Sequence, residues 1–198
     1  MAPRRTPRVR PSHQAGRPAG KRPRVLYFLA RGFQVLILKN VRVAVVTVSD
    51  SVSAGKSQDR SGPALSKRCE ELGWKVVSAR LSADDEPGLR TLISELADSG
   101  GVDLVLTSGG TGIGPRDVTP EATAAIVRKV LPGISERMRF EGQKSNPRAA
   151  LSRGIAGVRG SALIINLPGS PRGAVESLDA VSSLLPHAVA VLGGARHD

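Results

Sequence analysis

The strongest limit on the fold is set by residues 41–49, which read VRVAVVTVS. A continuous run of apolar, β-branched residues is typical of a strand that is buried on both faces. Such burial occurs mainly in parallel sheets that have helices packed on each side. The run therefore predicts a central strand of a parallel α/β sheet.

Strand-like runs and helix-like patterns alternate along the rest of the chain. Further strands are predicted at 74–81, 102–108 and 161–168, and helices at 62–72, within 82–101, and at 119–131, 131–144 and 170–192. This alternation predicts a three-layer α/β/α domain with a mostly parallel sheet, spanning residues 41–198. Ligands of such folds bind beyond the carboxyl ends of the strands, so the candidate site walls follow Ser49, Leu81, Ser108 and Leu167.

The formal net charge of +12 is concentrated at one end of the chain. Residues 1–40 hold ten of the 29 Lys and Arg and none of the 17 Asp and Glu, which leaves 19 basic and 17 acidic residues in 41–198. A nearly balanced domain gives no electrostatic case for nucleic-acid binding. No apolar run reaches the roughly 20 residues of a membrane span. The single cysteine, Cys69, fits a reducing cytoplasm and is interpreted as a buried helix residue. We therefore expect a cytoplasmic protein without nucleic-acid or membrane partners.

Residues 1–40 are interpreted as a basic, disordered N-terminal extension. Residues 1–24 are rich in Pro and Arg and show no periodicity. Two other interpretations stay open: translation starts downstream, near Val35 or Val41, or the segment is an organellar transit peptide. Arg31 interrupts the apolar stretch after residue 24, which argues against a secretory signal.

The loop after the third strand avoids bulky side chains, and its first residues are Ser108, Gly109, Gly110, Thr111 and Gly112. Glycine permits positive φ and close approach of backbone N–H groups to a ligand, and consecutive N–H groups bind anions. The glycine spacing matches neither a P-loop nor a dinucleotide fingerprint. The pattern alone leaves a phosphate cradle and a tight structural turn equally open.

Both candidate loops lead into predicted helices. Thr119 and Pro120 predict a capped helix start, whose positive end would face the same ligand. A second small-residue loop, Pro168, Gly169 and Ser170, follows the strand at 161–168 and opens another capped helix. We expect the two loops to face one crevice, although an ordinary capped helix explains the second loop equally well.

Carboxylates stand at three of the predicted strand ends. Asp50 follows the first strand, Asp84 and Asp85 follow the second, and Asp117 closes the glycine-rich loop. Mg²⁺ is typically held by one or two carboxylates together with phosphate oxygens and water. Acids beside an anion site therefore predict a shared metal, while Arg116 either pairs locally or contacts a phosphate.

Four segments together resemble the MogA/MoaB family of molybdenum-cofactor proteins, which includes the G domain of gephyrin. They are TVSDS at 47–51, TSGGTGIGPRDVTPEAT at 107–123, LSR at 151–153 and GVRGSALIINLPGSPRG at 157–173. The resemblance spans about Val41 to Leu192. It implies a molybdopterin adenylyltransferase, in which the terminal phosphate of molybdopterin attacks the α-phosphate of MgATP and releases pyrophosphate.

The resemblance also assigns roles by motif. It implies that Asp117 and Asp84 are the catalytic, metal-binding acids. The missing proline before Asp84 leaves Asp85 as an alternative there. Nucleotide contacts are implied for Ser49, Asp50 and Asp85. Molybdopterin is expected against two loops: Ser108, Gly109, Gly110, Thr111 and Gly112, and Pro168, Gly169 and Ser170.

The family is usually trimeric, so a homotrimer is expected, with possible contact to the molybdenum-insertion protein. The alternative function is a MoaB-type protein that binds molybdopterin without turnover. A third hypothesis, nucleic-acid binding through the basic residues 1–40, has no support from the domain itself.

Overall fold

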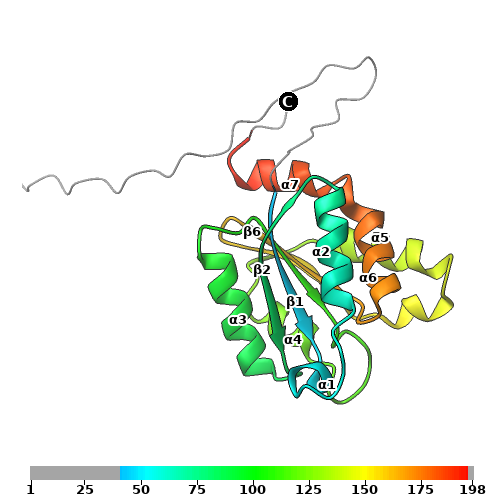
Figure 1. Ribbon diagram of the computed structural model, residues 1–198. Coiled ribbons are helices and arrows are strands. Elements are labelled where there is room, and N and C mark those ends of the chain that lie inside the picture. Colours follow the sequence, from blue (N-terminus) through cyan, green and yellow to red (C-terminus); the bar gives the residue numbers. More distant parts are fainter. Residues whose placement is uncertain (1–40, 196–198) are drawn as a thin grey trace, which may run out of the picture.

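The computed structural model describes residues 41–195 and is an α/β domain built on one six-stranded sheet (Figure 1). Residues 1–40 lie outside the described part, so their interpretation stays a prediction. The strands are β1 (Arg42–Val48), β2 (Lys75–Ser82), β3 (Leu104–Ser108), β4 (Lys129–Val130), β5 (Ala156–Arg159) and β6 (Ala162–Leu167). The helices are α1 (Asp50–Ser53), α2 (Ser61–Glu71), α3 (Glu86–Asp98), α4 (Thr119–Ala124), α5 (Pro132–Gln143), the 3₁₀ turn η1 (Pro147–Leu151), α6 (Pro171–Ser182) and α7 (Leu185–Leu192).

The sheet has the strand order β2-β1-β3-β6-β5-β4. β1 is parallel to β2 and β3, and β3 is parallel to β6, whereas β5 is antiparallel to both of its neighbours. The carboxyl ends of β2, β1, β3 and β6 therefore meet at one edge, as the sequence predicts. The loops that follow these four strands form the candidate site.

Helices cover both faces of the sheet, and alternate residues from Val41 to Val48 pack into the two opposite layers. Val41, Val43 and Val45 pack with α2, α5 and α6 on one face, while Ala44, Val46 and Val48 pack with α3 and α4 on the other. β3 and β6 are buried along their full length. Since both faces are covered, these strands need the continuous apolar runs seen in the sequence. The predicted three-layer α/β/α fold is confirmed.

Cys69 lies in the apolar layer between α2 and the sheet and is fully buried. Burial, which disfavours the thiolate, raises the pKa of its thiol to about 12. A protonated thiol that solvent does not reach is a packing residue, in agreement with the sequence interpretation.

The predicted helix at 119–131 is wrong in its second half. α4 ends at Ala124, and Lys129–Val130 forms the edge strand β4. Backbone pairing to β5 overrides the local helical pattern, with Arg128 N donating to Val158 O at 2.8 Å. Thr119 is also not the cap: Val118 holds that position, and the Thr119 hydroxyl donates to the Gly109 carbonyl at 2.9 Å. Because α4 has only six residues, its dipole gives only a small positive potential at its N-terminus.

The predicted helix at 170–192 is two helices. α6 ends at Ser182, and α7 begins at Leu185 with Pro186 in its first turn. The prediction that Ser170 caps α6 with Pro171 at its start is confirmed, because the Ser170 hydroxyl accepts from Gly173 N at 3.2 Å. Within residues 41–195 no single helix is long and apolar enough to cross a bilayer, although α6 and α7 pass that test as a pair bent by 64°.

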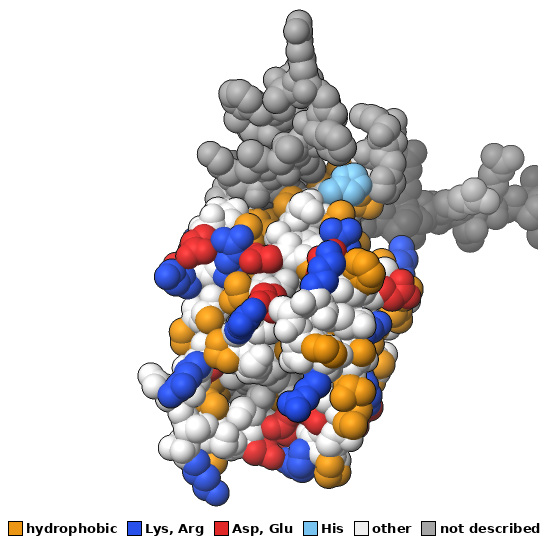
Figure 2. Space-filling view, turned by 90° about the vertical axis from the view of Figure 1, so that its right-hand side faces the viewer, with side chains coloured by type: hydrophobic (Ala, Val, Ile, Leu, Met, Phe, Trp, Pro, Cys, Tyr) orange, Lys and Arg blue, Asp and Glu red, His pale blue; other side chains and the backbone are white. Residues whose placement is uncertain are grey.

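Charged side chains are mixed over the face shown in Figure 2. Basic and acidic groups alternate there, and no continuous field of one sign covers the face. That distribution agrees with the near-neutral charge of residues 41–198 in the sequence.

Candidate active site

The two glycine loops pack directly on each other at the carboxyl edge of the sheet. Gly109 N donates to Leu167 O at 3.1 Å, and the Ser108 hydroxyl donates to Pro168 O at 2.9 Å. A Cβ on Gly169 would stand only 3.2 Å from the Gly109 Cα. The prediction that both loops face one crevice is therefore confirmed.

Two glycines of the first loop are required by its backbone. Gly109 has a φ of 113° and Gly110 a φ of 62°, in the region that L side chains rarely adopt. A Cβ on Gly109 would also collide with the carbonyl oxygen of Val48. The loop is thus both a strained turn and a surface without side chains, so the two sequence interpretations are compatible.

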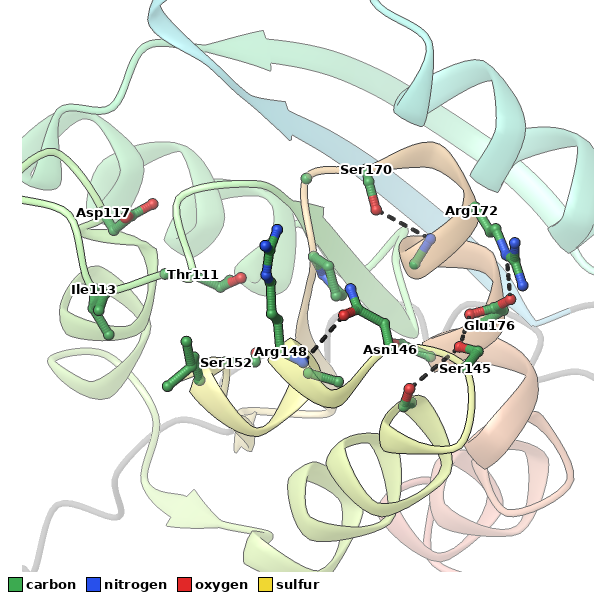
Figure 3. A pocket seen from close by; sticks show the side chains of 18 of the residues that line it. Thr111, Ile113, Asp117, Ser145, Asn146, Arg148, Ser152, Ser170, Arg172 and Glu176 are labelled. Atoms are coloured by element: carbon green, nitrogen blue, oxygen red, sulfur yellow. Dashed lines mark hydrogen bonds and ion pairs between the residues drawn. The ribbon is translucent and has the colours of Figure 1, made fainter.

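A cavity of about 690 Å³ opens between the two loops and the segment that joins α5 to η1 (Figure 3). Six of the eight residues predicted to contact molybdopterin line it: Gly110, Thr111, Gly112, Pro168, Gly169 and Ser170. Ser108 and Gly109 lie behind them and hold the loops together. A volume of this size is typical of a small-molecule site.

The far wall of the cavity was not predicted from the sequence. It consists of residues from the end of α5, η1 and the first turns of α6, among them Ser145, Asn146, Arg148, Arg172 and Glu176 (Figure 3). Asn146 fixes the start of η1, because its side-chain oxygen accepts from Arg148 N at 3.1 Å. An Asn-Pro pair is a recognised turn signal, so the segment could have been found as a loop but not as a cavity wall.

Arg153, in the LSR segment, holds the glycine-rich loop in shape. Its Nε donates to Gly112 O and its Nη2 to Asp117 O, each at 2.6 Å. Its Nη1 pairs with the carboxylate of Glu121. One guanidinium therefore ties together the middle of the loop, its end and the helix that follows. The sequence motif marked Arg153 without revealing this function.

Asp117 closes the glycine-rich loop on itself. Its Oδ2 accepts from Gly114 N at 2.7 Å, and its own N–H donates to Gly114 O at 3.0 Å. The same carboxylate lies beside Gly112, where a Cβ would stand 2.8 Å from Oδ2. Asp117 also lines the cavity, so the carboxylate is accessible to a bound ligand.

Asp50 and Asp84 form a reciprocal pair outside this cavity. Asp50 N donates to Asp84 Oδ2 at 2.9 Å, and Asp84 N donates to Asp50 Oδ1 at 3.0 Å. Arg116 donates two hydrogen bonds to the Asp50 carboxylate, from Nε to Oδ2 and from Nη2 to Oδ1, each at 3.0 Å. Arg116 therefore pairs within the protein, with a partner that is distant in the sequence.

The carboxylates near the glycine loop differ in their protonation behaviour. Hydrogen bonds from Arg116 and from the Asp84 backbone lower the pKa of Asp50. Burial raises the pKa of Asp84, and the negative charges of Asp50 and Asp117 raise it further. Asp84 also lies against the loop that holds Asp117, since a Cβ on Gly110 would be 2.9 Å from Asp84 Oδ1.

Asp85 and Ser49 have structural partners. The Asp85 carboxylate accepts from Gly88 N at 2.8 Å and caps α3, while the Ser49 hydroxyl caps α1. Neither lines the cavity, and neither do Asp50 and Asp84. Asp84 differs from Asp85 in lying beside Gly110 of the glycine-rich loop, whereas the Asp85 carboxylate is engaged in the cap of α3.

Replacing Asp85 with alanine is expected to lower the free energy of unfolding by about 1 kcal/mol, the usual cost of a lost N-cap. The adenylylation rate that the family resemblance implies should fall less than about threefold, because the Asp85 carboxylate stabilises the start of α3 and does not line the cavity. Thermal denaturation and a rate assay of Asp85→Ala beside Asp84→Ala would check this. A larger activity loss in Asp85→Ala than in Asp84→Ala would reverse the assignment.

The sequence that forms this site matches a known protein family. A family model described as "Probable molybdopterin binding domain" matches residues 44–187. The chain belongs to this molybdopterin-binding family. The matched range contains both glycine loops and all four candidate acids, so the predicted resemblance is confirmed over the part of the chain that forms the site.

Several relatives align over most of the domain. A molybdopterin adenylyltransferase of Helicobacter pylori strain J99 is 38% identical over 159 residues, which are 79% of this chain and 90% of the relative. A molybdopterin adenylyltransferase of Haemophilus influenzae is 40% identical over 143 residues, 71% of this chain and 73% of the relative. The structure of a molybdopterin biosynthesis enzyme MoaB from Thermus thermophilus is 45% identical, with a TM-score of 0.74 over 80% of this chain and 99% of that one.

Proposed function

We propose that the chain is a molybdopterin adenylyltransferase of molybdenum-cofactor biosynthesis, with ATP and molybdopterin as substrates. The observation that carries the proposal is the position of Asp84 and Asp117 against one glycine-rich loop. Asp84 lies beside Gly110, and Asp117 lies beside Gly112. These two glycines are two positions apart, so their Cα atoms are separated by at most about 7 Å. Two acids therefore flank a loop whose backbone suits an anion.

Molybdopterin occupies the cavity between the two loops in this proposal. Thr111 and Ser170 offer hydroxyl groups there, and the glycines expose backbone without side chains. The 12-residue α6 begins at the cavity, so its positive end favours the phosphate of the substrate. The pterin ring faces the Pro168 and Gly169 side, where no bulky side chain competes for the space.

ATP occupies the other side of the glycine loop, next to Asp50 and Asp84. In the reaction, an oxygen of the molybdopterin phosphate bonds to the α-phosphorus of ATP, and the bond from that phosphorus to the bridging oxygen breaks. Pyrophosphate leaves with the electron pair. The protein has to align the two phosphates and neutralise charge, and it needs no covalent nucleophile.

The residues present fit a Mg²⁺ ion shared with the nucleotide. Asp84 beside Gly110 and Asp117 beside Gly112 supply hard oxygen ligands near one loop, and Mg²⁺ usually takes only one or two carboxylates. When bound, the ion would neutralise phosphate charge.

The proposal is tested by incubating the purified protein with molybdopterin, ATP and Mg²⁺. Adenylylated molybdopterin and pyrophosphate should accumulate in equal amounts, as chromatography with mass detection would show. Omission of Mg²⁺ should abolish both products. Molybdopterin binding without any product would defeat the enzyme assignment.

A second candidate function is molybdopterin binding without turnover. Its support is the description of the matching family model, which names molybdopterin binding and no reaction. The retained Asp84 and Asp117 favour the enzyme, because acids add nothing to a site that only binds an anion.

The proposal extends to the assembly and its place in the cell. We infer a cytoplasmic homotrimer that hands its product to a molybdenum-insertion protein. Exposed large apolar side chains outside the cavity, including Val77, Val130 and Phe140, support contact with further copies or partners. Light scattering coupled to size exclusion should give three times the chain mass, and a monomer would contradict the inference.

Replacing Arg116 with methionine is expected to move the acid limb of the pH–rate profile to higher pH. The hydrogen bond and the positive charge of Arg116 lower the pKa of Asp50, and the same charge opposes the burial and the acidic neighbours that raise the pKa of Asp84. Its loss raises both pKa values, so the carboxylates become protonated, and activity is lost, at a higher pH as the pH falls. Arg128→Met, which removes a charge at the opposite end of the sheet, is the control. An acid limb that does not move in Arg116→Met would contradict the role given to these acids.

A further inference from the structure

Four charged side chains line the cavity, and three of them are already engaged within the protein. Arg172 pairs with Glu176 at 2.7 Å, and Glu176 also accepts from the Ser145 hydroxyl at 2.8 Å. Asp117 accepts from Gly114 N. The fourth charged side chain is that of Arg148.

The Arg148 guanidinium makes no hydrogen bond or ion pair with the residues that the structure describes. The backbone of Arg148 is nevertheless held firmly. Its N–H donates to the Asn146 side chain, and it belongs to η1 directly after Pro147. A guanidinium that has no partner in the protein, on a backbone that is held in place, is suited to binding an anionic ligand.

The side chain of Arg148 points into the cavity. Figure 3 shows it reaching from η1 toward the glycine-rich loop, between Thr111 and Ser170. Arg148 thus faces the two features of the opposite walls that favour anions: the glycine-loop backbone and the first turn of α6. The three groups converge on one volume from different elements.

We propose that Arg148 is a substrate-binding residue that contacts a phosphate monoester of the ligand in this cavity. The planar guanidinium fork matches two phosphate oxygens, which a single ammonium cannot do. The charge is also needed, because the carboxylate of Asp117 shares the cavity and repels a phosphate dianion. The inference rests on the proposed function and names the residue that offsets this repulsion.

The test measures binding and turnover separately in Arg148→Gln and Arg148→Lys. Without ATP, Arg148→Gln should weaken the Kd for molybdopterin about ten- to hundredfold, the effect of losing hydrogen bonds to a charged group. Arg148→Lys should recover part of that loss. In the rate assay, the KM for molybdopterin should rise while the KM for ATP stays within about twofold, because the acids on the ATP side lie outside the cavity.

Two controls separate a phosphate contact from a general effect. Arg128→Gln removes the same charge from a site at the other end of the sheet and should leave the Kd unchanged. Dephosphorylated molybdopterin should bind wild type and Arg148→Gln equally. Since Arg148 is exposed, its variants should also keep the melting temperature of the wild type.

Three results would overturn the inference: an unchanged molybdopterin Kd in Arg148→Gln, an equal weakening for the dephosphorylated ligand, or an equal rise in both KM values. Failure of the proposed function is distinguishable, because the Kd is measured without turnover. If the wild type does not bind molybdopterin at all, inorganic phosphate without Mg²⁺ becomes the probe. Calorimetry should then show phosphate binding that Arg148→Gln weakens, and equal binding by both proteins would end the proposal.

Discussion

Asp117→Ala is expected to lower kcat about 100- to 1,000-fold, the scale of losing one preorganised electrostatic group. The Kd for molybdopterin should stay the same or tighten, because Asp117→Ala removes a carboxylate that repels the phosphate of the ligand. Asp117 lines the cavity and lies on the same loop as Gly110, which is beside Asp84. In the proposed reaction, Asp117 therefore stands where the two substrates meet. Rapid-quench turnover and equilibrium binding would measure the two effects.

The control for this prediction keeps the loop intact. In Asp117→Asn the side-chain oxygen can still accept from Gly114 N, which preserves the turn while removing the charge. Turnover should fall nearly as far as in Asp117→Ala, with the melting temperature of the wild type. Near-normal turnover in Asp117→Asn would mean that the loop needs an acceptor there and not a charge. Equal losses of turnover and binding would also contradict a catalytic role.

The sheet could be predicted from the sequence because its strands are buried on both faces. Val43 and Ala44 point to opposite layers, yet each meets a helix, so the run of apolar residues is continuous. Ser108 and Leu167 end strands of this kind, so the sequence places the two glycine loops at the carboxyl edge of the sheet. Strands that are buried on both faces need continuous apolar runs, and such runs can be recognised in the sequence.

The edge of the sheet could not be predicted in the same way. β4 has two residues, and its pairing with β5 replaces the end of a locally helical pattern. β5 has four residues and includes a glycine, so it carries little strand signal of its own. The two-residue turn at Gly160, with a φ of 57°, was an available hairpin signal between β5 and β6.

The acids could be named from the sequence, but their partners could not. A motif places Asp50, Asp84 and Asp117 near one edge of the sheet, while the link between Asp50 and Asp84 crosses 34 residues. The sequence leaves Arg116 either to pair locally or to contact a phosphate, and only the fold shows that its partner is Asp50. The same holds for the cavity wall at Asn146 and Arg148, which has no periodic pattern.

Arg153→Ala is expected to lower kcat at least tenfold and to destabilise the fold by about 2–4 kcal/mol, since two backbone carbonyls lose a charged donor. Arg153 is a positioning residue: it holds Gly112 O and Asp117 O, and through them the backbone on which the two acids converge. Misplacement of reacting groups by about 1 Å can cost roughly 100-fold in rate. Thermal denaturation and steady-state kinetics would give both quantities.

Arg153→Lys separates position from charge. A lysine keeps the positive charge beside Glu121 but lacks the planar fork, so it cannot serve both carbonyls in this geometry. We therefore expect kcat to fall about tenfold or more in Arg153→Lys, with little change in the KM for ATP. Glu121→Gln, which removes only a half-exposed ion pair, should cost less than about 1 kcal/mol and little activity. Wild-type kcat in Arg153→Lys would show that the charge alone matters, and the loop would then owe its shape to Gly109, Gly110 and the turn at Asp117.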